Sequence, residues 1–140
     1  GRTVAHLMGQ NRAQLVVGEG TDYTLTITYA AVDFGTTDAA VTLPTAGTYA
    51  LDALLTWAPD SAGGTLDAKL YNSTDAADVA GSERRTDEQT LTANIRQHAL
   101  QAIVTVTASK TIKIYAHDPN GSAGSVVKAA WTSIRYIRLY

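Results

Sequence analysis

Polar and apolar residues alternate along most of this chain, which is the period of a half-buried β-strand. The segment 48–58, TYALDALLTWA, places one apolar row on a single face, made of Tyr49, Leu51, Ala53, Leu55 and Trp57. The segment 21–30, TDYTLTITYA, has the same pattern, with its apolar row at Tyr23, Leu25, Ile27 and Tyr29. Each run predicts a strand with one face turned to a core and the other to solvent.

The pattern continues through the second half of the chain. The runs 65–71, 100–108 and 111–117 all alternate, and the last two are joined by a short turn at Ser109 and Lys110. That pair predicts a β-hairpin, although its turn lacks the favoured Asn-Gly chemistry. The final segment, 125–140, predicts one long strand with Trp131 and Ile137 on one face and Ile134 and Tyr136 on the other.

Clusters of Gly, Pro, Asp, Ser, Thr and Asn separate these runs at intervals of roughly 10 to 15 residues, the rhythm of a sandwich or barrel. The most polar stretch, 81–90, is interpreted as an exposed connection with strand at its edges, and no window favours a long amphipathic helix. We predict one all-β domain over residues 21–140, a sandwich of about 8–10 antiparallel strands. Residues 1–20 are expected to form a short N-terminal arm and the first strand.

Composition narrows the functional classes. Of the 140 residues, 45% are hydrophobic and only 17% charged, and the net charge is −2. A polyanion-binding surface needs a basic excess, so nucleic acid is not an expected partner. No apolar run is long enough for membrane insertion. Cysteine is absent, which removes disulfides, thiol nucleophiles and Cys-based metal sites.

No catalytic or metal-binding pattern emerges from the remaining residue types. The three histidines are far apart and show no ligand spacing: His6, His98 and His117. The acidic neighbours lie in polar loops and are interpreted as solvated turn residues: Asp75 with Asp78, and Asp87 with Glu88. The sequence GSAGS at 121–125 does not match a serine-hydrolase elbow. We therefore expect no enzyme activity, no cofactor and no metal.

Two segments match the acceptor pattern for N-linked glycan, Asn72-Ser73-Thr74 and Asn120-Gly121-Ser122. Asn, Ser, Thr and Asp also hydrogen-bond their own backbone in turns. We interpret both as exposed turns rather than as glycosylation sites.

Tyrosines point to contacts between subunits. Four of the seven tyrosines lie opposite the aliphatic row of their strand: Tyr71, Tyr115, Tyr136 and Tyr140. A tyrosine at such a position buries its ring while its hydroxyl remains in contact with water, which is typical of an interface.

Several segments resemble the jelly rolls of the complement-C1q and tumour-necrosis-factor superfamily, and in particular phage-encoded variants. They are VTLPTAGTYALDALLTW, DAKLYNSTDAADVAGSERR, LQAIVTVTASKTIKIYAHD and AAWTSIRYIRL, and the likeness covers roughly residues 21–140. The resemblance implies a jelly-roll sandwich that forms a homotrimer around a three-fold axis. Carried over by position, the candidate interface residues are Tyr49, Tyr115, Tyr136 and Tyr140.

From this likeness we expect a virion structural protein on the surface of a bacteriophage particle, either a capsid decoration protein or the head of a fibre. Its partners would be two further copies and, through the N-terminal arm, other virion proteins. The alternative is a carbohydrate- or receptor-binding module for host attachment, whose partner would be a host-surface glycan. Its candidate ligand-binding residues are Trp57, Asp60, Asp118 and Asn120.

Overall fold

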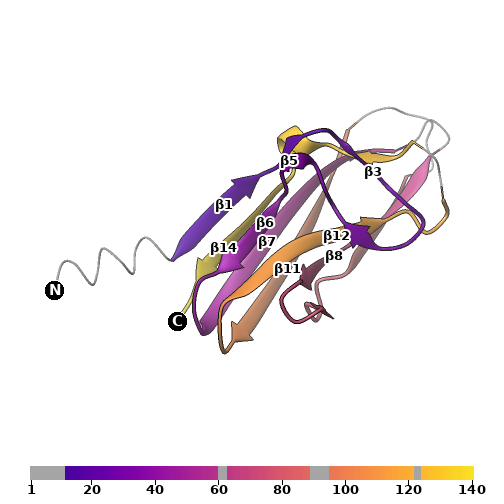
Figure 1. The fold of residues 1–140 in the computed structure, drawn as a ribbon. Coiled ribbons are helices and arrows are strands. Elements are labelled where there is room, and N and C mark those ends of the chain that lie inside the picture. Colours follow the sequence, from indigo (N-terminus) through magenta and orange to yellow (C-terminus); the bar gives the residue numbers. More distant parts are fainter. Residues whose placement is uncertain (1–11, 60–62, 89–94, 122–123) are drawn as a thin grey trace.

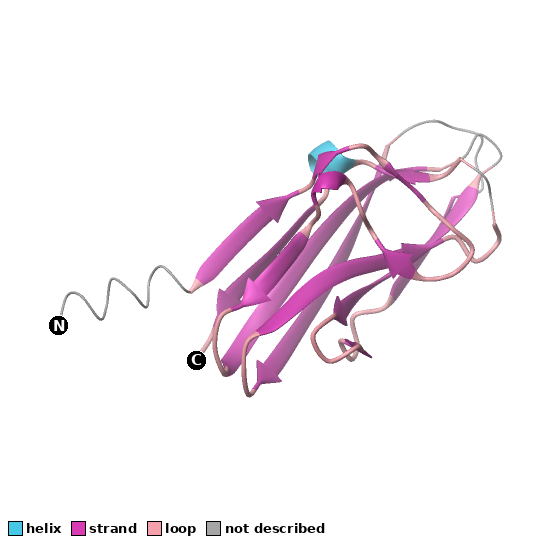
Figure 2. Ribbon diagram, in the orientation of Figure 1, coloured by secondary structure: helices cyan, strands magenta, loops and turns pink. Residues whose placement is uncertain are grey.

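The computed structural model describes residues 12–59, 63–88, 95–121 and 124–140. In these ranges the chain forms two β-sheets that face each other, with one short 3-10 helix, η1 (Ala129–Trp131), at one end (Figures 1 and 2). This confirms the prediction of an all-β sandwich.

One sheet, here the β7 sheet, is built around the longest strand, β7 (Gly47–Ala58). Its neighbours are antiparallel to it: β14 and β13 lie along one edge of β7, and β11 lies along the other. Strand β1 pairs with β14, and β3 pairs with β13. The bounds of these strands are β1 Ala13–Val17, β3 Tyr23–Thr24, β11 Arg96–Val106, β13 Val126–Val127 and β14 Ser133–Arg138.

The opposite sheet, here the β8 sheet, centres on β8 (Gly64–Asn72) and β12 (Lys110–His117). Strands β10 and β9 pair with β8, and strands β6 and β4 pair with β12. A separate ribbon joins β2 to β5. The bounds are β2 Glu19–Gly20, β4 Ala30–Ala31, β5 Gly35–Thr37, β6 Ala40–Leu43, β9 Ala77–Asp78 and β10 Arg84–Glu88.

Successive long strands alternate between the two sheets. The chain passes from β6 to β7, from β7 to β8, from β10 to β11 and from β11 to β12, and changes sheet each time. These crossings between layers give the jelly roll its shape and bring residues far apart in sequence side by side.

The core lies between the sheets and follows the predicted alternation. All five apolar residues expected on one face of β7 are buried, with Trp57 and Leu55 fully enclosed. The β8 sheet contributes a second row with no exposed surface: Leu66, Ala68 and Leu70. Burial of aliphatic and aromatic side chains at this density is the main driving force for the fold.

The predicted hairpin at Ser109 and Lys110 is wrong, because the two strands that it joins lie in different sheets. Strand β11 pairs with β7, whereas β12 pairs with β8, β6 and β4. The turn is therefore a corner between layers. Local alternation cannot distinguish such a corner from a hairpin, since both strands show the same period on either side of the turn.

Three other expectations about strands are corrected. Of segment 21–30, only Tyr23–Thr24 and Ala30 lie in paired strands. Loop residues bind the backbone groups between them, because the Leu25 amide donates to the Ser125 carbonyl and the Thr26 carbonyl accepts from the Asp118 amide. The final segment is interrupted by η1. The polar stretch 81–90 contains an edge strand, β10, in its interior, where a connection with strand only at its ends was expected.

The first sequon forms the predicted turn. The Asn72 side chain accepts from the Asp75 amide at 3.0 Å and donates to the Asp75 carboxylate at 3.0 Å, and residues 73–76 form the turn. The second sequon includes Ser122, which lies outside the described residues.

Candidate subunit interface

The outward side of the β7 sheet is a four-strand surface, here called the apolar face. Strands β1, β14, β7 and β11 lie side by side, and their pairing registers align every second residue into rows. The middle row runs Leu15, Arg135, Asp52, Gln101, and its neighbours run Ala13, Ile137, Ala50, Ile103 and Val17, Ser133, Leu54, Ala99. These rows bring residues up to 124 positions apart in sequence (13 to 137) onto one surface.

Large hydrophobic side chains on this face are exposed. Ile103 is 70% exposed and Leu15 is 62% exposed, on opposite edges of the surface. Val17 and Ile137 are also exposed on this surface. Trp131, at its η1 end, is 58% exposed. Single exposed apolar residues are ordinary in proteins, but several on one surface are typical of an interaction site.

Charge is sparse on the same surface. At the outward positions described for these four strands, Arg135 and Asp52 are the charged residues, and they bind each other at 2.7 Å between Nη2 and Oδ2. The remaining outward residues are aliphatic, alanine, serine, threonine or glutamine. Because these two charges neutralise each other, the described outward positions of the face carry no net charge.

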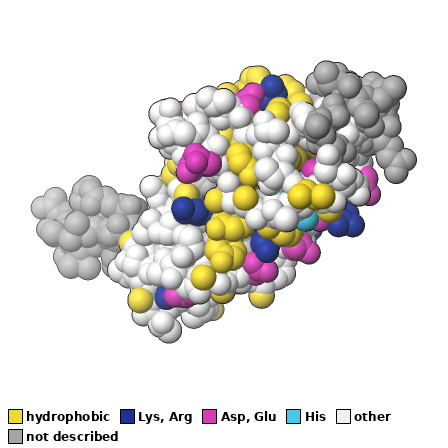
Figure 3. Space-filling view, turned by 45° about the vertical axis from the view of Figure 1, so that its right-hand side comes forward, with side chains coloured by type: hydrophobic (Ala, Val, Ile, Leu, Met, Phe, Trp, Pro, Cys, Tyr) yellow, Lys and Arg dark blue, Asp and Glu magenta, His cyan; other side chains and the backbone are white. Residues whose placement is uncertain are grey.

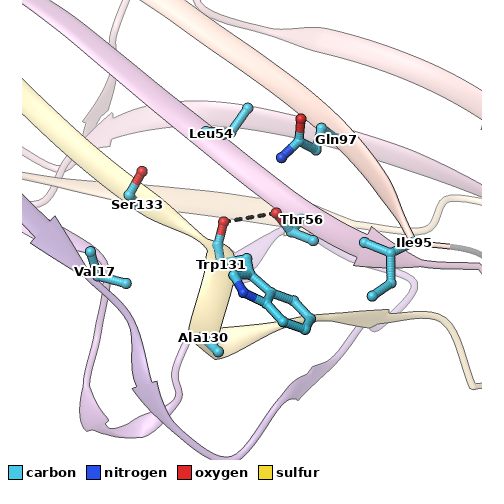
Figure 4. Close-up of a pocket in the computed structure, with 8 residues that line it drawn as sticks. All are labelled: Val17, Leu54, Thr56, Ile95, Gln97, Ala130, Trp131 and Ser133. Atoms are coloured by element: carbon cyan, nitrogen blue, oxygen red, sulfur yellow. Dashed lines mark hydrogen bonds between the residues drawn. The ribbon is translucent and has the colours of Figure 1, made fainter.

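The apolar face is hollowed at its η1 end. A shallow hollow of about 510 Å³ is lined by uncharged residues, and Figure 4 shows Trp131 along one side of it, with Val17, Leu54, Thr56, Ile95, Gln97, Ala130 and Ser133 around it. The Thr56 hydroxyl donates to the Trp131 carbonyl at 2.7 Å and holds the end of η1 against β7. The hollow can therefore accept an apolar group.

Helix η1 explains why Trp131 lies outside. The Thr132 amide donates to the Ala129 carbonyl, and the Thr132 hydroxyl accepts from the Thr56 amide. This turn breaks the alternation expected through the segment, so that Ala129 and Val127 are buried while Trp131 is exposed. A continuous strand would have placed the three on one face.

Two of the four tyrosines proposed for an interface are core residues of the single chain. Tyr49 has no exposed surface and Tyr136 is 4% exposed, and their rings meet edge to face with centroids 5.4 Å apart. The Tyr49 hydroxyl donates to the Thr45 carbonyl at 2.8 Å, and burial raises the pKa of Tyr136. These two side chains present no surface to a partner.

The other two tyrosines lie elsewhere. Tyr115 is on the outward side of the β8 sheet, where it stacks on Tyr71 with ring centroids 4.1 Å apart. Tyr140 is 82% exposed at the end of the chain, where its backbone pairs with Thr48 at the start of β7. The structure therefore brings Tyr49 and Tyr136 together in the core and leaves Tyr115 and Tyr140 apart from them.

The residues proposed for a carbohydrate site do not form an open site. Trp57 and Asp118 have no exposed surface, and Asp60 lies outside the described residues. The Asp118 carboxylate accepts from the backbone amide of Asn120, and the Asn120 side chain donates to the Thr65 hydroxyl. Trp57 is therefore a core residue, and Asp118 and Asn120 hold the loop that follows β12.

The outward side of the β8 sheet, here called the charged face, is built in a different way. Asp67 accepts two hydrogen bonds from the Arg85 guanidinium, at 2.6 and 2.8 Å. His117 lies 3.0 Å from the same carboxylate through Nε2 and 2.8 Å from the Ile27 carbonyl through Nδ1. The Arg85 guanidinium holds the pKa of the Asp67 carboxyl below its ordinary value.

Aromatic rings extend this network. The ring of Tyr29 lies against His117 with centroids 3.9 Å apart, and the Lys69 ammonium is 4.0 Å from the centre of the same ring. The Tyr29 hydroxyl donates to Glu83, and Lys69 binds Asp78 at 2.8 Å. In the view of Figure 3, basic and acidic side chains likewise lie next to one another. The charged side chains of this network are thus paired within the chain.

Histidines and acidic residues form no metal site in the part of the chain that the structure describes. His98 is buried on β11, its Nε2 hydrogen-bonds the Arg84 carbonyl at 3.1 Å, and burial lowers its pKa. His117 belongs to the charged face, and His6 lies outside the described residues. No helix within the described ranges is long and apolar enough to cross a membrane.

Sequence reasoning missed the apolar face, although part of its signal was present. Leu54 interrupts the polar side of its strand, and Ile103 lies out of phase with Leu100. Those positions become one surface only when the registers of four strands are known, and the registers depend on pairings between distant segments.

Comparison with known proteins identifies the fold. No protein-family model matches the chain, and no curated protein is similar in sequence. Among solved structures, the structure of Eiger TNF from S. frugiperda is similar, with a TM-score of 0.60, 10% sequence identity, and coverage of 92% of this chain and 92% of that chain. Identity this low shows the fold alone. The chain has a TNF-like jelly-roll fold.

Proposed function

We propose that this protein is a non-catalytic structural module that works as a homotrimer joined through the apolar face. The observation that carries the proposal is the set of exposed hydrophobic side chains on β1, β14 and β11, which lie on one surface with β7 between β14 and β11. Covering them removes apolar surface from water, which contributes about 25 cal/mol for each Å² buried.

A second copy of the chain suits this face better than a charged partner does. The described outward positions of the face carry no net charge, because Arg135 and Asp52 neutralise each other. The edge strand β11 of another copy, which carries no Lys, Arg, Asp or Glu from Gln97 to Val106, offers matching apolar chemistry. Closed rings of identical subunits use such surfaces, and the sequence resemblance implies a ring of three.

We propose a bacteriophage particle as the setting, with the trimer on the virion surface as a capsid decoration protein or as the head of a fibre. The support is the sequence likeness of the four quoted segments to phage-encoded jelly rolls. Residues 1–11, which lie outside the described ranges, remain the proposed arm that contacts other virion proteins.

A carbohydrate- or receptor-binding module is the second candidate. The observation in its favour is Trp131, an exposed indole beside an uncharged hollow that also presents Gln97 and Ser133. Neutral sugars bind to aromatic rings flanked by amide and hydroxyl groups. Binding to a glycan array that is lost in Trp131→Ala, while the trimer persists, would favour this role.

The trimer is tested by measuring molar mass with light scattering at micromolar concentration. We expect three times the chain mass of 14.8 kDa for the unaltered protein and one chain mass for Ile103→Asp. The matched control is Ile27→Asp, which changes an equally bulky residue, 61% exposed, that lies off the apolar face. A monomeric unaltered protein, or a trimeric Ile103→Asp variant, would contradict the proposal.

The setting is tested separately by imaging native particles with an antibody against this chain. Label spread over the capsid supports a decoration protein, and label at the end of an appendage supports a fibre head. Absence of label from any particle would remove the virion role while leaving the trimer intact.

A further inference from the structure

The ring of His117 lies between two hydrogen-bond acceptors. Its Nδ1 is 2.8 Å from the Ile27 carbonyl oxygen, and its Nε2 is 3.0 Å from Oδ2 of Asp67. The side chain is 13% exposed, so the ring is largely buried between these two partners. A backbone carbonyl accepts a hydrogen bond and never donates one, so Nδ1 must carry a hydrogen to bond Ile27.

The contact with Asp67 requires a hydrogen on Nε2 as well. A carboxyl group donates to a ring nitrogen only when it is protonated. The Arg85 guanidinium binds both oxygens of the Asp67 carboxylate and thereby lowers the pKa of Asp67. Asp67 is therefore an ionised acceptor, and both nitrogens of His117 are donors. The imidazolium is the form of histidine with two N–H groups.

The groups around the ring suit a positive charge. Charged and titratable side chains on this face come from β8, β9, β10, β12 and the segment before β10: Asp67, Lys69, Asp78, Glu83, Arg85, Asp87, Lys113 and Tyr115. Asp78 offsets the charge of Lys69 at 2.8 Å. The ring of Tyr29 lies against His117 with centroids 3.9 Å apart, and an aromatic face attracts a cation.

His117 binds the middle of the connection 25–29, which joins β3 to β4. Strand β3 belongs to the β7 sheet and β4 to the β8 sheet, so this connection crosses from one layer to the other. Its first two residues are held by backbone hydrogen bonds to the loop that follows β12. The His117 bond reaches Ile27, whose side chain is 61% exposed. One imidazole thus ties a surface connection to strand β8 through Asp67.

We propose that His117 is a proton-operated clamp, whose imidazolium ties the connection 25–29 to β8 and releases it when a proton leaves the ring. The neutral ring keeps one N–H, and the bond to Asp67 is the stronger of the two because its acceptor is charged. Nε2 therefore keeps its hydrogen, and the lone pair of Nδ1 then faces the Ile27 carbonyl. Two acceptors repel each other, so the connection loosens as the pH rises. The clamp belongs to the single chain and is independent of the proposed trimer.

The protonation of His117 is tested in the full chain by the NMR resonances of its ring nitrogens, which the variant His117→Gln assigns. At pH 7.5 we expect two protonated nitrogens on His117. His98 is the internal control and should show one protonated nitrogen, because burial lowers its pKa. A single protonated nitrogen on His117 at this pH would overturn the proposal.

Loosening of the connection is tested by hydrogen exchange, corrected for the chemical dependence of exchange on pH. The reporters are the amides of Leu25 and Asp118, which bond Ser125 and Thr26. Between pH 6.5 and the pH at which Nδ1 has lost its hydrogen, we expect their protection to fall at least about 10-fold, as for a lost hydrogen bond to a charged group.

Two variants show whether the ring of His117 causes this change. In His117→Gln the protection of both amides should not depend on pH, because the amide side chain does not titrate. In the matched control His98→Gln it should fall as in the unaltered chain. Constant protection in the unaltered chain, or an equal fall in His117→Gln, would contradict the clamp.

Discussion

The two outward faces of this sandwich are made from the same kind of strand but differ in how their side chains are partnered. On the charged face, Asp67 binds Arg85 and His117, and Lys69 binds Asp78. On the apolar face the ion pair of Arg135 and Asp52 lies among hydrophobic side chains that are partly exposed to solvent. Alternation of polar and apolar residues decides which side of a strand is buried. On the outward side, the contacts that side chains make within the chain indicate whether the face is complete alone or suits a contact with another molecule.

The edges of the two sheets show the same difference. Strand β10 closes one edge of the β8 sheet and carries charged residues at four of its five positions, in the sequence RRTDE. Strand β11 closes an edge of the β7 sheet and has no charged residue from Gln97 to Val106. Charged edge strands resist pairing with other chains, and uncharged ones permit it. At this edge, as on its outward face, the β7 sheet therefore carries few of the charges that oppose association.

Removing the centre of the charged face should have the largest effect on the stability of the fold. Asp67→Ala leaves His117 without its carboxylate partner and frees the Arg85 side chain. We expect a loss of about 2 kcal/mol in the free energy of unfolding, measured by urea titration, with the trimer mass unchanged. A loss of the trimer without a loss of stability would reverse the assignment of the two faces.

A smaller loss in the free energy of unfolding should appear as the pH falls. Its source is His98, which links the two sheets. Burial lowers the pKa of His98 on β11, which bonds the Arg84 carbonyl of β10. The folded protein therefore takes up this proton less readily than the unfolded chain. The resulting stability is fully present above the unfolded pKa of about 6.5 and is lost as the pH falls through the lower folded value.

The check is the melting temperature between pH 7.5 and pH 5. His98→Gln keeps a donor for the Arg84 carbonyl but cannot titrate, so its melting temperature should fall less over this interval. If the melting temperature falls equally with pH in the variant and in the unaltered protein, His98 is not the source of the pH dependence.

The stacked tyrosines of the charged face should contribute still less to the free energy of unfolding. Tyr71 and Tyr115 lie on neighbouring strands with ring centroids 4.1 Å apart. A double-mutant cycle with Tyr71→Ala and Tyr115→Ala should give a coupling of about 1 kcal/mol in the free energy of unfolding. If trimer dissociation showed the coupling instead, the pair would belong to a subunit contact.

The smallest effect on the fold is expected on the apolar face. Leu15 is 62% exposed at the outer edge of β1, so Leu15→Ser should change the unfolding free energy of the dissociated chain by no more than about 0.5 kcal/mol. The same substitution should weaken the trimer, because it removes apolar area from the contact. Equal dissociation of variant and unaltered chain would exclude β1 from the interface.

The sequence predicts the core and the fold class because burial of one strand face leaves a period-two pattern. The inward row of β7 was correctly predicted for this reason, down to the enclosure of Trp57. The pattern fails where backbone groups bond to loops, as at Leu25, and where η1 interrupts the last strand. It also fails on β14, because Ile134 is buried and Ile137 is 40% exposed, and the sequence marks neither as the inward one.

The candidate site was harder to predict than the fold. Its residues come from four strands that are adjacent only after long-range pairing, so no local window contains the site. The position of Tyr136 on its strand and the resemblance that added Tyr49 pointed to two residues whose rings fill the core instead. Arg135 and Asp52 are 83 positions apart, and only the register of β14 on β7 makes them a pair.

Hydroxyl-radical labelling read by mass spectrometry tests the contrast between the two faces most directly. The unaltered chain is compared with the Ile103→Asp variant at one concentration, and labelling is followed at Leu15, Ile137 and Trp131 on one face and at Tyr71 and Tyr115 on the other. We predict that the first three are protected in the unaltered chain relative to the variant, while both tyrosines are labelled equally. Equal labelling of the first three in both proteins, or protection of the tyrosines alone, would contradict the account.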